Sequence, residues 1–221
     1  MFSEKNAVLV TLVLILVLIS TALLFSSAFP ATAAASSAQS GGPEYTGDGH
    51  LKLPENYREW VYLTTGFDMS YNPGMRMGHH MFDNVFVDPA SYKAFVETGT
   101  WPDKTTLVLE QRGAETSSIN KTGSSQATDV MGIEVHVKDE ARFPGKWAFF
   151  GFNDGKIGDL FPKDAECYKC HAAHAAVDTT FVQFYPTLLP IAKAKGTLSA
   201  GYVAESAKSG SAGNDGGGEK K

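Results

Sequence analysis

Cys167, Cys170 and His171 stand at a spacing that predicts covalent haem attachment. On a helix the two thiols lie one turn apart, so both can add to the vinyl groups on one edge of a porphyrin. The imidazole of the next residue then lies beneath the metal, where it can ligate iron. The motif therefore predicts one haem c, attached through Cys167 and Cys170, with His171 as the iron ligand.

A zinc site, a dithiol redox pair and a disulfide are the other interpretations of two cysteines at this spacing. Zinc needs further soft ligands, and the chain has only these two cysteines. A redox pair calls for a surrounding βαβ pattern, which the sequence lacks, and a disulfide across two residues closes a loop too short to stabilise much. The haem is favoured over all three.

The ligand on the other side of the iron decides what such a haem does. Electron-transfer cytochromes fill that position with methionine or histidine, whereas haems that bind small ligands or catalyse leave it open. His174 follows His171 by one turn on the same helix face, so it cannot reach that side and is expected on the helix surface. The other candidates are Met69, Met75, Met77, Met81, Met131, His50, His79, His80 and His136.

Residues 131–138 alternate in polarity, with Glu134, His136 and Lys138 on one face and apolar residues on the other. A polar face of this kind normally points to water. It can also line a polar haem pocket, where Glu134 would accept a proton from a bound substrate. The alternation alone leaves both interpretations open.

The elements that must position these residues are mainly strands. Stretches rich in β-branched and aromatic residues, separated by turn residues, predict antiparallel strands at residues 82–87, 106–112, 131–138 and 146–152.

Three helices complete the prediction. Asp88 and Pro89 give the start of a helix that ends at Glu97, before Gly99. Two more helices are expected, one at 164–176, which carries the cysteines, and one at 187–195. The predicted class is α+β: a mainly antiparallel β-sheet with a few packed helices and the haem motif on a C-terminal helix.

The ends of the chain predict export and flexible flanks. Residues 7–25 form an apolar run without charge, so residues 1–33 are expected to be a signal peptide, or an uncleaved anchor because the run is long enough to span a membrane. A Ser/Gly-rich linker is expected at 34–50, the haem domain at 51–201 and a flexible Gly/Ser/Lys tail at 202–221. The protein is therefore expected in the periplasm or secreted.

The composition indicates one folded domain and gives no indication of a macromolecular partner. The chain has 221 residues, of which 43% are hydrophobic, enough for one core. Its net charge is −5 and its basic residues are scattered, so no nucleic-acid partner is expected.

Several stretches, taken in order, make the chain resemble the cytochrome P-460 family, which includes the cytochromes c'-beta. These stretches are LPENYREWV at 53–61, VFVDPASY at 85–92, GIE at 132–134, WAF at 147–149, the Cys-x-x-Cys-His motif, Asp178, and TFVQFYP at 180–186. The resemblance spans nearly the whole expected domain. It implies a mainly antiparallel sheet, a homodimer and a five-coordinate haem with His171 as proximal ligand.

The family that the chain resembles has two kinds of member. Its enzymes oxidise hydroxylamine to nitrous oxide and carry a lysine joined to the porphyrin edge, whereas the c'-beta members lack that link and bind nitric oxide or carbon monoxide in an apolar distal pocket. The resemblance places Leu109 at the lysine position and Glu134 at the distal carboxylate. Lys104 lies five positions upstream of Leu109, on the opposite face of an extended strand, so it cannot replace that lysine.

Leu109 therefore favours an exported monohaem cytochrome with an open distal site for nitric oxide or a related small nitrogen ligand, served by an unidentified redox partner. A hydroxylamine-oxidising oxidoreductase with Glu134 as proton acceptor is one alternative. A six-coordinate electron-transfer cytochrome is the other.

Overall fold

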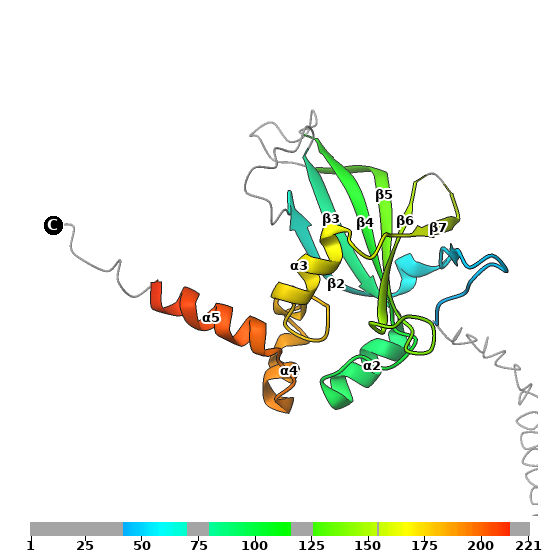
Figure 1. The fold of residues 1–221 in the computed structure, drawn as a ribbon. Coiled ribbons are helices and arrows are strands. Elements are labelled where there is room, and N and C mark those ends of the chain that lie inside the picture. Colours follow the sequence, from blue (N-terminus) through cyan, green and yellow to red (C-terminus); the bar gives the residue numbers. More distant parts are fainter. Residues whose placement is uncertain (1–41, 70–79, 116–125, 154, 213–221) are drawn as a thin grey trace, which may run out of the picture. The chain divides into compact units, whose positions relative to one another are not determined.

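In the computed structural model, residues 42–69, 80–115, 126–153 and 155–212 are described. They form one seven-stranded sheet with the order β1-β7-β6-β5-β4-β3-β2, in which every neighbouring pair is antiparallel. Together with the helices that follow the sheet (Figure 1), this confirms the predicted α+β class.

The expected signal peptide, including the apolar run at 7–25, lies outside the described residues. Within the described ranges, no helix has both the length and the apolar character needed to cross a membrane.

Four of the strands coincide with the predicted ones, and three were not predicted. The unpredicted strands lie at or next to the edges of the sheet, where fewer side chains are buried and alternation is weak: the edge strand β2 leaves Tyr62 and Phe67 about half exposed. The strands are β1 (Leu51–Lys52), β2 (Val61–Phe67), β3 (Met81–Val87), β4 (Thr106–Glu115), β5 (Gln126–Lys138), β6 (Trp147–Phe152) and β7 (Ile157–Leu160).

Helix α2 (Pro89–Thr98) confirms the prediction from its end residues. The Asp88 carboxylate accepts a hydrogen bond from the Ser91 backbone N–H at 2.8 Å, and Pro89 occupies the first helical position, where no N–H is needed. Gly99 closes the helix with a φ of 78°, the left-handed conformation that glycine adopts without a steric penalty.

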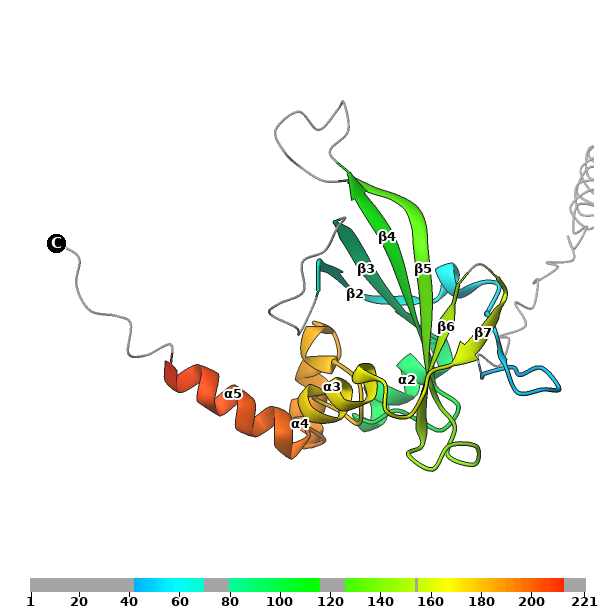
Figure 2. The ribbon, with the colours of Figure 1, turned by 45° about the horizontal axis from the view of Figure 1, so that its top comes forward.

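The chain after β7 is helical. It contains α3 (Glu166–His174), the 3₁₀ turn η2 (Val182–Phe184), α4 (Leu189–Lys195) and α5 (Ala200–Ala212). Helices α3 and α4 fall within the spans expected at 164–176 and 187–195. Figures 1 and 2 show α5 leading away from the sheet.

Helix α5 enters the segment 202–221 that composition predicted to be a flexible tail, and residues up to Ala212 are helical. Ser199 holds the start of this helix, because its hydroxyl accepts a hydrogen bond from the Tyr202 N–H at 3.1 Å and donates one to the Ala175 carbonyl at 2.6 Å. Residues 213–221 lie outside the described part.

Apolar clusters cover both faces of the sheet. Along β4, Leu107 joins the cluster on the helix side, whereas Val108 joins the cluster beneath β1 and the 3₁₀ turn η1 (Tyr57–Glu59). On β6, Trp147 belongs to the cluster on the helix side and Phe150 to the cluster beneath β1 and η1. Because both faces are covered, polar side chains on the helix side of the sheet can be buried, as His136 and Lys138 are.

Candidate haem-binding site

The haem motif lies on helix α3, directly after the sheet. Cys167 and Cys170 are half-buried free thiols, three residues apart on the helix, so they occupy neighbouring turns of one face. Burial raises the pKa of both thiols, which therefore stay neutral at pH 7. Their placement meets the requirement for two bonds to one edge of a porphyrin.

The ring of His171 is held in one tautomer. Its Nδ1 lies 2.7 Å from the Thr179 carbonyl oxygen. Because a carbonyl only accepts hydrogen bonds, Nδ1 carries the proton and Nε2 keeps a free lone pair. Burial lowers the pKa of His171 to about 4, so the ring is neutral at pH 7. A neutral imidazole that donates from Nδ1 and offers Nε2 is a metal ligand in its usual form.

Aromatic rings surround His171 and fix its plane. The centroid of its ring lies 4.2 Å from that of Phe181, 4.7 Å from that of Phe149 and 5.3 Å from that of His136. Phe149 comes from β6 and Phe181 from the segment after α3, so the sheet and the helical part of the chain both position the ring.

His171 forms part of the wall of a cavity of about 230 Å³ between the sheet and the segment that follows α3. Much of this wall is apolar, with Val85 and Leu107 from the sheet and Phe184 from η2 among its members. Polar side chains on the described part of the wall include those of Thr64, Asp83, Gln111, Glu134, His136, Thr180 and Tyr185.

Leu109 lies on the sheet side of this wall, paired in register with Val85 on β3 and Glu134 on β5. Within the described ranges, no lysine belongs to the wall. Lys104 lies before β4 begins, and its ammonium group bonds to the buried carboxylate of Asp139. On the described part of the wall, position 109 is therefore occupied by an apolar side chain, and Lys104 is engaged elsewhere.

Among the residues that the structure describes, two carboxyl groups lie on the wall, those of Glu134 and Asp83. Burial raises the pKa of Glu134, and the charge of Asp83 raises it further. Burial also raises the pKa of Asp83, against the lowering effect of hydrogen bonds from Gln111 and from the Met69 backbone. The polar face of β5 thus lines the cavity at Glu134, and both carboxyls hold their protons to a higher pH than exposed acids do.

His136 belongs to the same wall and contacts the ring of His171 edge to face. Its ring stacks on Phe149 with a centroid distance of 3.9 Å, and its Nε2 is 3.2 Å from the Thr179 hydroxyl. Thr179 is also the residue whose carbonyl binds His171 Nδ1. Thr179 therefore binds both imidazoles, His136 through its hydroxyl and His171 through its carbonyl.

Few of the candidates for the opposite axial position reach the cavity. Among those that the structure describes, Met69 and His136 line the wall. The imidazoles of His50, His80 and His174 pair instead with Asp159, Asp68 and Glu205. His174 thus occupies the helix-surface position expected from its spacing. Met75, Met77 and His79 lie outside the described residues.

Three groups at the site were not predicted from the sequence. Thr179 acts through its backbone carbonyl, a group that every residue has. Phe181 belongs to a stretch that supports the family resemblance but carries no signal of its own. Asp83 did have a signal, because in the strand predicted at 82–87 it shares a face with Val85 and Val87, where a lone carboxyl is unusual.

The residues present fit a haem c. Two neutral thiols one turn apart, a neutral imidazole with a free Nε2 and an adjoining cavity with apolar and aromatic walls are the groups that attachment, iron ligation and porphyrin burial require. No curated protein sequence matches the chain. The family profile described as Cytochrome P460 matches residues 54–182, which include Leu109, Glu134 and the haem motif. The chain belongs to the cytochrome P460 family.

Proposed function

We propose that this protein is an exported monohaem c-type cytochrome that binds nitric oxide or a related small nitrogen ligand at an open position of its iron, without efficient hydroxylamine oxidation. The observation that carries the proposal is the apolar side chain of Leu109 on the cavity wall. The family resemblance assigns this position to the cross-linking lysine of the enzymes. The family implies haem c, and Cys167 and Cys170 could attach it.

The chain supplies three functions around such a haem. Cys167 and Cys170 would hold the porphyrin, and His171 would ligate the iron through Nε2 while its Nδ1 donates to Thr179. Leu109 and the neighbouring apolar residues would keep water away from the ligand. When bound, the haem supplies an iron that changes oxidation state and coordinates small molecules.

The proposal also includes the location of the protein, its oligomeric state and a redox partner. A periplasmic or secreted location follows from the apolar run at 7–25, acting either as a cleaved signal or as an anchor. A homodimer is implied by the family, and a redox partner is required to set the oxidation state of the iron.

The test is a set of absorption spectra of the purified ferrous protein, with and without carbon monoxide and nitric oxide. We expect a high-spin, five-coordinate spectrum of an ordinary c-type haem that shifts on addition of either gas. Low-spin spectra in both oxidation states without carbon monoxide binding would establish the electron-transfer alternative, for which Met69 is the methionine on the described part of the wall. Steady hydroxylamine turnover with a shifted, cross-linked haem spectrum would also contradict the proposal.

A second candidate function, hydroxylamine oxidation, is favoured by the placement of Glu134 on the cavity wall with a raised pKa. A carboxylate there can accept protons from a nitrogen substrate, and general-base catalysis of this kind contributes typically about 10²–10⁴-fold. In that case Glu134→Ala would lower turnover by about that factor with unchanged haem content. Leu53→Ala, outside the cavity on the other side of the sheet, serves as a control for general damage. An unchanged rate in Glu134→Ala would remove the proton-accepting role.

A further inference from the structure

We propose that Lys138 and Asp178 are positioning residues for the iron ligand: together they hold the turn Val177–Thr180 so that the Thr179 carbonyl faces His171 Nδ1. This inference rests on the proposed function to the extent that His171 must ligate a haem iron. It goes beyond that function because neither residue lines the cavity or reaches the iron ligand directly.

The turn itself is tight and conformationally constrained. Val177 and Thr180 exchange two backbone hydrogen bonds, with N···O distances of 2.9 and 3.4 Å. Asp178, at the first central position, has a φ of 52°, a left-handed conformation that asparagine and aspartate tolerate better than other side-chain-bearing residues. Thr179, at the second, directs its carbonyl to His171. Any loosening of this turn therefore moves the hydrogen-bond acceptor of the iron ligand.

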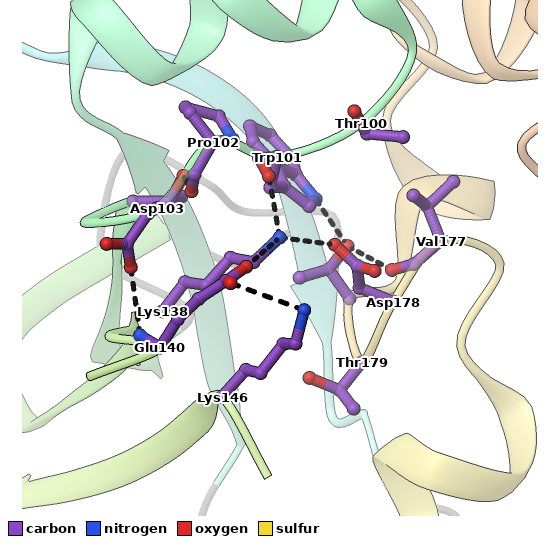
Figure 3. A network of polar contacts seen from close by, with 12 residues as sticks. Thr100, Trp101, Pro102, Asp103, Lys138, Glu140, Lys146, Val177, Asp178 and Thr179 are labelled. Atoms are coloured by element: carbon purple, nitrogen blue, oxygen red, sulfur yellow. Dashed lines mark hydrogen bonds and ion pairs between the residues drawn. The ribbon is translucent and has the colours of Figure 1, made fainter. Parts of the chain in front are cut away.

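Lys138, the last residue of β5, contacts the turn through Asp178. Its side chain is only 9% exposed, and its ammonium group lies 2.7 Å from the Trp101 carbonyl oxygen and 3.4 Å from the Asp178 carboxylate (Figure 3). Glu140, 3.6 Å away, is its third neighbour. Burying an ammonium group costs desolvation free energy, so its ion pair contributes little net stability. Buried charged groups of this kind are better attested as groups that fix one conformation.

Trp101 holds the other end of the same turn. Its indole N–H donates to the Thr180 hydroxyl at 2.7 Å, and that hydroxyl donates to the Val177 carbonyl at 2.8 Å. Lys138 thus contacts the first central residue of the turn, Asp178, and also the backbone of Trp101, which holds the last residue of the turn, Thr180. The two contacts place the turn against the sheet, next to the ring of His171.

The effect on the haem follows from the hydrogen bond at Nδ1. Donation from Nδ1 to a well-placed carbonyl makes the imidazole a stronger electron donor through Nε2. A stronger donor stabilises ferric iron and so keeps the reduction potential low, since hydrogen bonding around the axial ligand is one of the levers on potential. Weakening the Lys138–Asp178 contact therefore raises the potential and weakens the bond between iron and His171.

The experiment measures the reduction potential and the ferrous iron–histidine stretching frequency of the holoprotein in two variants, Lys138→Met and Asp178→Asn. Asparagine keeps the preference for positive φ at position 178 while removing the charge. We expect both variants to raise the potential and to lower the stretching frequency. A purely electrostatic influence would instead move the potential in opposite directions, because one variant removes a positive charge and the other a negative charge.

Lys146→Met is the matched control, because Lys146 pairs with Glu140 in the same network at 3.3 Å and is mostly exposed. It should leave both measurements unchanged. Opposite shifts in the two test variants, or no shift in Asp178→Asn, would overturn the inference. If Lys138→Met fails to fold, Asp178→Asn decides through the stretching frequency, because loss of a negative charge alone raises the potential but leaves the Nδ1 hydrogen bond and the frequency unchanged. This variant is expected to fold, since the Asp178 side chain is one-third exposed. Failure of the proposed function is separate, since it would appear in the unsubstituted protein as absent haem or as a six-coordinate low-spin spectrum.

Discussion

Replacing both Cys167 and Cys170 with alanine is expected to abolish covalent haem attachment, so that denaturing electrophoresis followed by haem staining shows no haem on the chain. The two thiols are the chain's only cysteines, and thioether formation has no other nucleophile of this type to use. The single variants are expected to keep one bond each and to stain more weakly.

The matched control for this experiment is Lys169→Ala, between the two cysteines. The Lys169 side chain is mostly exposed and its ammonium group lies 3.4 Å from the Glu166 carboxylate, a surface contact worth little. Full haem staining in this control shows that a substitution within helix α3 does not by itself prevent haem attachment. Haem that remains attached to the double alanine variant would contradict the assignment of the motif.

Trp101→Ala is expected to destabilise the protein by about 3–5 kcal/mol, as deletion of a large buried aromatic side chain usually does. Trp101 is 2% exposed, and its ring centroid lies 4.4 Å from that of Phe95 on helix α2. It also donates to the Thr180 hydroxyl, so its removal loses packing and a buried hydrogen bond together. Since whole domains are stable by only about 5–15 kcal/mol, this is a large share of the total.

Trp101→Phe separates the two contributions, because phenylalanine keeps most of the ring but cannot donate. We expect a loss of about 1–2 kcal/mol for this variant, from the hydrogen bond and a small change in volume. Urea unfolding followed by far-ultraviolet circular dichroism gives both values. Equal losses in the two variants would show that packing against Phe95 contributes little.

Where local residues decide the structure, the sequence predicted it well. Helix α2 depends on Asp88, Pro89 and Gly99, which act within a few residues of each other, and its bounds agree with the prediction to one residue. The central strands are similar, because each combines β-branched and aromatic residues and is bounded by turn residues close to it in the sequence. The Cys-x-x-Cys-His spacing falls on helix α3 for the same local reason.

Contacts between distant parts of the chain decided what the sequence did not predict. Whether Glu134 and His136 face water or a cavity depends on the segment after α3, more than 40 residues later, which covers that face of the sheet. The acceptor of the His171 N–H is the backbone carbonyl of Thr179. Since every residue has a backbone carbonyl, the residue type does not predict this contact. Helix α5 forms in a Gly- and Ser-containing stretch because Ser199 caps it and Glu205 pairs with His174.

The position of both cysteines on one helix, three residues apart, has a consequence for refolding. Bonds at Cys167 and Cys170 connect no distant parts of the chain, so they remove little conformational entropy from the unfolded state, unlike a cross-link over a long loop. They would, however, keep the haem on the unfolded chain at a high effective concentration. Refolding of the holoprotein would then be independent of added haem and of dilution.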